Sequence, residues 1–278
     1  MSLSLASIHV YPVKSLGGFE VAEARLTDRG LEHDRRWMLV DGNGRFVSQR
    51  EVQEMACLHT SPSPEGFRVT DIRNGDTLDL PWELSSGPGE EVVVWEDRMS
   101  ATKAMPAPSA WFSARLQRTL ELVYMPDHTE RNVDRNYAEG ITSFSDGFPY
   151  LIISQASLDE LNARIPMGER VSMERFRPNL VVAGGVPFQE DAWSRIHVGA
   201  ARFDVVKPCS RCIITTTDQR TGERSKEPLR TLATFRRDLS PARTGKVDFG
   251  MNAMGDHDGT VTRGAIVTIL GSKTATLE

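Results

Sequence analysis

The sequence has few cysteines, and their number and spacing restrict the class of protein. Only Cys57, Cys209 and Cys212 occur among 278 residues, and two of them form a C-x-x-C motif. An odd count of this kind is not the disulfide framework of a small secreted protein and favours a reducing cytoplasm. Three thiols also exclude a four-cysteine iron–sulfur cluster.

Charge, hydropathy and glycine spacing exclude other classes of partner. The net charge of −5 makes general nucleic-acid binding an unexpected function. No apolar run approaches the roughly 18 residues of a membrane span, and the first residues lack a signal-peptide pattern. No G-x-G-x-x-G follows an expected strand, so we expect no flavin or nicotinamide dinucleotide site. These absences favour a cytoplasmic globular protein without a membrane span.

What is present favours a mostly-β (α+β) fold. The length and the hydrophobic content of 39% allow one large domain or two modest ones with a real core. In the first hundred residues, short strand-like segments alternate with turns rich in glycine, proline and asparagine, as in a small barrel or sandwich. The expected strands there are 6–11, 21–27, 37–40, 45–48, 67–72, 77–80 and 91–95.

The rest of the chain mixes strands with helices. Residues 101–108 resemble a linker or the approach to a helix over 111–120. Ser157 and Glu160 predict a capping box for a helix over 158–165. Pro228, followed by apolar residues at helical spacing, predicts a helix over 227–237. The expected strands are 179–183, 196–198, 202–206, 213–217 and 265–270. We expect two β-barrel-like parts that share a crevice.

The segment Cys209-Ser-Arg-Cys212 admits four interpretations. A redox pair would need a helix after the first cysteine, and the β-branched run 213–217 disfavours one. A structural zinc site needs four ligands, while Cys57 lies far away in the sequence. The two cysteines could be inert and buried. Alternatively, one thiolate is a soft ligand to a metal carried by an organic cofactor, with Lys207 and Arg211 close enough to hold an anion.

Five motifs, taken together and in this order, resemble the MOSC family. They are Tyr11-Pro-Val-Lys-Ser15, Asp34-Arg-Arg-Trp37, Phe144-Ser-Asp-Gly-Phe-Pro149, Arg175-Phe-Arg-Pro-Asn179, and Cys209-Ser-Arg-Cys212 with the following Thr-Thr-Thr-Asp218. The similar group carries an N-terminal MOSC β-barrel domain and includes the mitochondrial amidoxime-reducing component and its bacterial homologues. The resemblance implies an N-terminal β-barrel domain over 1–105, a linker or helix over 106–124, and a MOSC domain over 125–273.

The resemblance also implies a site for the molybdenum–molybdopterin cofactor. Cys212 would ligate molybdenum, and Asp146 would lie beside the metal, although Gly147 and Phe148 stand where the family often has a small or hydroxyl residue. The positions that match those holding the pterin and its phosphate are Lys14, Ser15, Arg35, Arg177, Asn179, Ser210 and Arg211. A phosphate dianion in a crevice needs several such cationic donors to offset its desolvation.

By the same resemblance, the expected activity is reduction of small N-hydroxylated or N-oxide-type substrates. Asp146 would orient the substrate or relay a proton. Because the sequence shows no redox centre of its own, electrons would come from a separate ferredoxin-, flavodoxin- or cytochrome-type protein. Two alternatives from other classes stay open. One is a non-catalytic cofactor carrier or sulfur-transfer module, and the other is a zinc-stabilised binding module.

Overall fold

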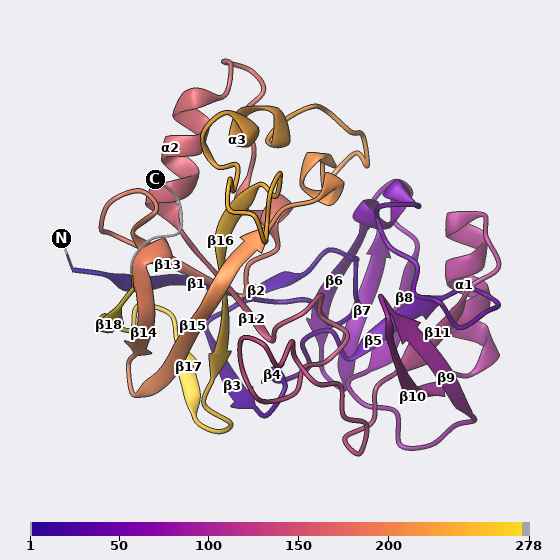
Figure 1. The fold of residues 1–278 in the computed structure, drawn as a ribbon. Helices are drawn as coiled ribbons and strands as arrows, with labels where there is room; N and C mark the ends of the chain where they lie inside the picture. Colours follow the sequence, from indigo (N-terminus) through magenta and orange to yellow (C-terminus); the bar gives the residue numbers. More distant parts are fainter. Residues whose placement is uncertain (1, 274–278) are drawn as a thin grey trace.

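The computed structural model describes residues 2–273 and contains two strand-rich halves (Figure 1). The strands of the first half of the chain are β1 (Ser4–Val10), β2 (Phe19–Val21), β3 (Glu23–Thr27), β4 (Gly30–Leu31), β5 (Trp37–Val40), β6 (Leu58–Ser63), β7 (Gly66–Asp71), β8 (Thr77–Pro81), β9 (Gly89–Val94), β10 (Asp97–Lys103) and β11 (Glu121–Tyr124). Those of the second half are β12 (Tyr150–Ser154), β13 (Leu180–Ala183), β14 (Trp193–Val198), β15 (Ala201–Ser210), β16 (Asp248–Gly255), β17 (Thr260–Thr262) and β18 (Val267–Ser272). The α-helices in the described part are α1 (Pro106–Leu116), α2 (Gln155–Arg164) and α3 (Leu229–Phe235).

An eight-stranded sheet forms one half, in the order β18-β14-β15-β16-β12-β13-β1-β2. One strand of this sheet, β1, comes from the N-terminus and pairs antiparallel with β13. Figure 1 shows this indigo strand among the orange ones. Only the β12–β13 pair is parallel among the described strands of this sheet. Apolar side chains of β1, β12, β13, β15 and β16 alternate inward and build one core. This half therefore contains the two ends of the described chain.

Smaller sheets form the other half, with the strand orders β5-β11-β10-β9 and β6-β7-β8. Helix α1 packs against β11 and β8, and its buried Phe112 and Leu116 join the core of this half. A third small sheet, β17-β3-β4, joins a strand from near the C-terminus to strands from near the N-terminus, and its buried side chains belong to the core of the eight-stranded sheet. The mostly-β class expected from the sequence is confirmed.

Two segments differ from their expected strands. Residues 213–217 do not form a strand, because Ile213–Thr216 is a short 3-10 helix. The hydroxyls of Thr215 and Thr216 donate to the carbonyls of Cys212 and Ile213, at 2.9 and 2.7 Å, and these local bonds override β propensity. Residues 45–48 make only isolated bridges, Arg45 with Val93 and Phe46 with Val40.

Two helix starts also differ from expectation. Residues 101–103 continue β10, and α1 begins at Pro106, where proline is tolerated because the first N–H groups of a helix have no intrahelical partner. Helix α2 begins at Gln155 and not at Leu158, so the expected capping box is wrong. Its N-cap is Ser154, whose hydroxyl accepts the Ser157 N–H at 3.1 Å. The domain limits near residues 105 and 125 remain a prediction.

Candidate cofactor-binding site

One pocket brings together residues from seven separate stretches of the chain. All nine residues expected from the sequence line it: Lys14, Ser15, Arg35, Asp146, Arg177, Asn179, Ser210, Arg211 and Cys212. The pocket also contains residues that the sequence did not single out as site residues: Arg50, Ser145, Gly147, Phe148, Leu151, Phe176, Cys209, Ile214 and Asn252. Its cavity volume is about 110 Å³.

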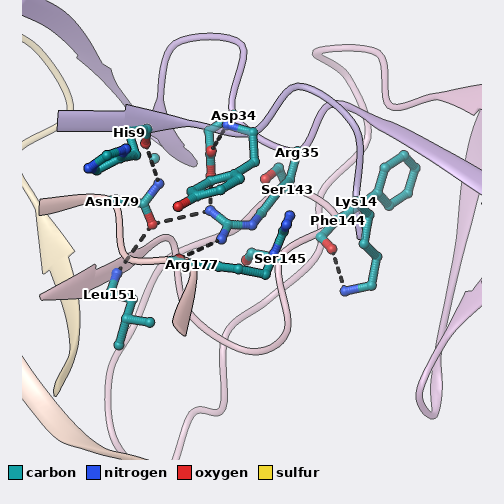
Figure 2. Close-up of polar contacts among 12 residues, drawn as sticks. His9, Lys14, Asp34, Arg35, Ser143, Phe144, Ser145, Leu151, Arg177 and Asn179 are labelled. Atoms are coloured by element: carbon teal, nitrogen blue, oxygen red, sulfur yellow. Dashed lines mark hydrogen bonds and ion pairs between the residues drawn. The ribbon is translucent and has the colours of Figure 1, made fainter. Parts of the chain in front are cut away.

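Arg35 and Asn179 line one side of this pocket and are hydrogen-bonded to each other. Arg35 has a positive φ of 51°, and its guanidinium donates to Asp34, to the side-chain oxygen of Asn179 and to the carbonyl of Arg177. Figure 2 shows that the Asn179 oxygen also accepts the Leu151 N–H, while its amide nitrogen donates to the His9 carbonyl. The protein itself therefore occupies the side-chain oxygen of Asn179 and one of its two amide N–H groups. The second amide N–H makes no hydrogen bond within residues 2–273.

Arg177 lies beside Arg35 in an environment that disfavours its charge. The Tyr11 ring contacts both guanidinium groups, with the Arg35 carbon 4.6 Å and the Arg177 carbon 4.3 Å from its centroid. Arg177 Nη1 donates to the Leu16 carbonyl at 2.5 Å, whereas the buried Nη2 has no hydrogen-bond partner among residues 2–273. Burial, aided by repulsion from Arg35, lowers the pKa of Arg177 to about 10. A buried cation with an unused donor is typical of a site for an anion.

Lys14 and Asp146 form an ion pair at the other side of the pocket. Buried Lys14 Nζ donates to Asp146 Oδ1 at 2.7 Å. It also donates to the Phe144 carbonyl at 2.7 Å, the contact drawn in Figure 2. Burial lowers the pKa of Lys14 to about 8, against the opposing effect of Asp146. Burial also acts to raise the pKa of Asp146, but Lys14 and Arg50 hold it well below its usual value. Asp146 is therefore a carboxylate at neutral pH.

Arg131, which the sequence did not single out, shapes the loop that carries Asp146. Its guanidinium is almost fully buried and donates to the carbonyls of Ser143, Ser145 and Asp146, at 3.2, 2.5 and 3.0 Å. Three carbonyls that point at one cation fix the loop conformation, so the Asp146 side chain is presented to the pocket. Nothing in the local sequence around Arg131 indicates this role.

The two cysteines of the C-x-x-C differ in their surroundings. Cys209 lies at the end of β15, where burial raises the pKa of its thiol and its sulfur accepts Arg211 Nη1 at 2.9 Å. Cys212 is partly exposed and lines the pocket from the turn after β15. The remaining thiol, Cys57, is buried elsewhere, with its sulfur 3.7 Å from the carbonyl of Arg220. Residues 2–273 hold no cluster of three or more His, Cys, Asp or Glu side chains that could bind a metal.

The residues between the cysteines are held from two sides. Arg211 Nη2 donates to the Phe176 carbonyl at 2.7 Å, while its buried Nε has no partner among the described residues. The Ser210 hydroxyl donates to Asp248 and accepts from Arg243, both at 2.9 Å. These two hydrogen bonds occupy the Ser210 hydroxyl and fix the turn that carries Cys212. The sequence reasoning missed Arg243 and Asp248, which lie about 30 residues further along the chain.

The fold and the site thus define a mostly-β protein with a cationic pocket that two partly exposed thiols line. The MOSC N-terminal beta barrel domain matches residues 2–119, and the MOSC domain matches residues 139–268. Human mitochondrial amidoxime-reducing component 1 is 30% identical over 283 residues, which cover 96% of this chain and 83% of that protein. The chain belongs to the MOSC-domain family, in the group with an N-terminal MOSC β-barrel domain.

Other relatives share only part of their length with this chain. Molybdenum cofactor sulfurase of Solanum lycopersicum is 32% identical over 270 residues, which cover 89% of this chain but 32% of that protein. The chain therefore spans about a third of the length of these sulfurases. Among solved structures, the YUAD protein from Bacillus subtilis aligns with 96% of this chain and 94% of its own at 11% identity, with a TM-score of 0.41. No helix within residues 2–273 has the length and apolar character to cross a membrane.

Proposed function

We propose that this protein is a molybdenum-cofactor-dependent reductase of small N-hydroxylated or N-oxide-type molecules. One observation carries the proposal. Nine residues from distant parts of the chain line a single pocket, and two buried guanidinium nitrogens there, on Arg177 and Arg211, have no protein acceptor among the described residues. The similarity to human mitochondrial amidoxime-reducing component 1 over most of both chains supports the reductase assignment.

The donor set fits the cofactor. A phosphate dianion needs several cationic donors, and the unpartnered nitrogens of Arg177 and Arg211 match this need, with Lys14 and Ser15 lining the same pocket. The free amide N–H of Asn179 can donate to the pterin. Cys212 would supply the thiolate ligand, since the Cys209 sulfur is already engaged by Arg211.

When bound, the cofactor would supply a metal that accepts the substrate oxygen and stores an electron pair. The overall reaction takes two electrons and two protons from outside the substrate and converts N–OH to N–H and water. The task of the protein is orientation and proton supply. The Asp146 carboxylate would accept a hydrogen bond from the substrate, and Lys14, whose pKa is near 8, lies one hydrogen bond behind it as a proton source.

We propose that electrons reach this pocket from another protein. A ferredoxin-, flavodoxin- or cytochrome-type protein would dock transiently at the pocket mouth, over a small interface. The chain itself shows neither a dinucleotide fingerprint nor four cysteines for a cluster.

A second candidate is a cofactor carrier or sulfur-transfer module, which the similarity to molybdenum cofactor sulfurases favours. Protein made in a molybdenum-replete host should contain molybdenum and pterin, and elemental analysis also tests for zinc. It should then reduce benzamidoxime to benzamidine with reduced methyl viologen. Full molybdenum occupancy without turnover would contradict the reductase and support the carrier.

A further inference from the structure

We propose that Arg50 is a specificity residue that binds an anionic group of the substrate, so that this reductase prefers N-oxygenated molecules that carry a carboxylate. The inference rests on the proposed function and adds the substrate class. Arg50 lies in the loop between β5 and β6 and lines the pocket next to Asp146, with 24% of its side chain exposed.

Arg50 differs from the other cations of the pocket because its hydrogen-bond donors are unused. Lys14, Arg35, Arg177 and Arg211 each donate to protein carbonyls, carboxylates or a thiol. The Arg50 guanidinium makes no hydrogen bond to any residue from 2 to 273, and its nearest carboxylate oxygen, Asp146 Oδ2, is 3.8 Å away. A guanidinium presents five N–H donors in a planar fork that suits a carboxylate.

The protein nevertheless holds this side chain in place. The guanidinium stacks on Trp95, with 4.4 Å between its carbon and the ring centroid. Trp95 in turn contacts the Phe46 ring, with 4.9 Å between centroids. Arg224, from the second half of the chain, donates to the main-chain carbonyls of Gln49 and Arg50. The backbone and the guanidinium plane of Arg50 are therefore both fixed, while its N–H edge stays open to the pocket.

Trp95 occupies its position at a conformational cost. It is the first of two residues that join β9 to β10, and its φ is 59°. A bulky side chain rarely adopts this region, and glycine is favoured there in two-residue hairpin loops of this kind. Such strain persists where the surroundings or a function maintain it. Here it places the indole beneath the Arg50 guanidinium.

Arg50 has no hydrogen-bonded counter-ion among the described residues, because Asp146, its nearest carboxylate at 3.8 Å, is hydrogen-bonded to Lys14. Five cationic side chains line the pocket, and Asp146 is the one anionic side chain among its lining residues. Asp34 offsets Arg35 from behind, and Lys14 forms the hydrogen-bonded partner of Asp146. A cofactor phosphate would be matched by Arg177 and Arg211, the cations with buried unpartnered nitrogens. One positive charge remains at the partly exposed side of the pocket, where a substrate enters.

The test compares three benzamidoximes with the same reacting group and different para substituents: carboxylate, methyl and trimethylammoniomethyl. The holoprotein is assayed with reduced methyl viologen. We expect kcat/KM to be highest for the carboxylate and lowest for the ammonium compound. Arg50→Gln should lower kcat/KM for the carboxylate compound roughly tenfold and change that of the methyl compound less than about twofold. Arg50→Lys should keep part of the preference.

Arg98→Gln is the matched control, because Arg98 lies on the same β9–β10 hairpin and pairs with Glu91 at the surface. Calorimetric titration of the holoprotein with the same compounds measures the preference without turnover. Equal kcat/KM and equal Kd for all three compounds would overturn the proposal, as would a loss of molybdenum and pterin in Arg50→Gln, which would make Arg50 a cofactor ligand. Binding with the expected preference but no turnover would instead overturn the reductase and leave Arg50 as the anion-binding residue.

Discussion

Arg177→Gln tests whether the buried Arg177 guanidinium binds the phosphate of the cofactor. The glutamine amide keeps a donor for the Leu16 carbonyl but removes the charge and the unpartnered Nη2. If that nitrogen binds the cofactor phosphate, the variant loses one charge-assisted hydrogen bond. Such a bond contributes about 1.5–3 kcal/mol, so the Kd of the cofactor should rise roughly ten- to a hundredfold.

The cofactor-free protein should respond differently. Burial lowers the pKa of Arg177 to about 10, so the charge is less favourable there than in water when no ligand is bound. We therefore expect the free energy of unfolding of the cofactor-free variant to change by less than about 1 kcal/mol. The gain in Tm on cofactor binding should shrink, because ligand stabilisation follows affinity.

The assay measures pterin and molybdenum retained after extensive dialysis, and Tm with and without cofactor. Arg118→Gln is the control, since Arg118 is a half-exposed arginine that lies 3.6 Å from Glu51 and outside the pocket. Retention in Arg177→Gln equal to that of the control would refute the reasoning and make Arg177 a structural residue. A large loss of stability in the cofactor-free variant would do the same.

Four further predictions follow from the structure. Cys212→Ser should abolish molybdenum binding while Cys209→Ser retains most of it, and equal retention by elemental analysis would refute the ligand assignment. The isolated holoprotein should reduce benzamidoxime with reduced viologen but not with NADH alone; turnover with NADH would reveal a redox site that we have missed. Ser154→Ala removes the cap of α2 and a hydroxyl donor of the buried Glu190 carboxylate, so urea unfolding should show a loss of about 1.5–4 kcal/mol. An unchanged urea midpoint would contradict that network. Because burial lowers the pKa of Lys14 from 10.5 to about 8, the unfolded chain binds more protons between these values. The stability of the cofactor-free protein should therefore rise with pH across this window, by up to about 3 kcal/mol relative to Lys14→Met, and parallel pH profiles would contradict the shift.

Several features of the site could be predicted from the sequence because they are local. The motif around Cys212 combines a thiol with neighbouring cations within a few residues. Together with four other short motifs in the expected order, it indicated the family. All nine residues expected on this basis line the pocket. Their assignment as ligands remains a prediction, since lining a pocket is a weaker property than binding.

Other features could not be predicted, because they depend on residues that are distant in sequence. Arg131 shapes the Asp146 loop through three carbonyls, and Arg243 and Asp248 hold Ser210. Arg50 owes its position to a strained Trp95 and to Arg224. None of these partners lies in a recognisable motif, since an arginine that binds main-chain carbonyls requires no particular neighbouring sequence.

By itself, the sequence determined the mostly-β class and the residues available for the site, because alternation of apolar residues and turn chemistry act over a few positions. The tertiary structure alone decided how these residues are used. It pairs β1 with β13, some 170 residues away, and so carries Lys14 and Ser15 to the same pocket as Arg177. It also distinguishes two cysteines that are three positions apart, because Arg211 donates a hydrogen bond to the Cys209 sulfur, although both thiols line the pocket. Burial and charge pairing are properties of the folded surroundings of a residue, and the chain must fold before they exist.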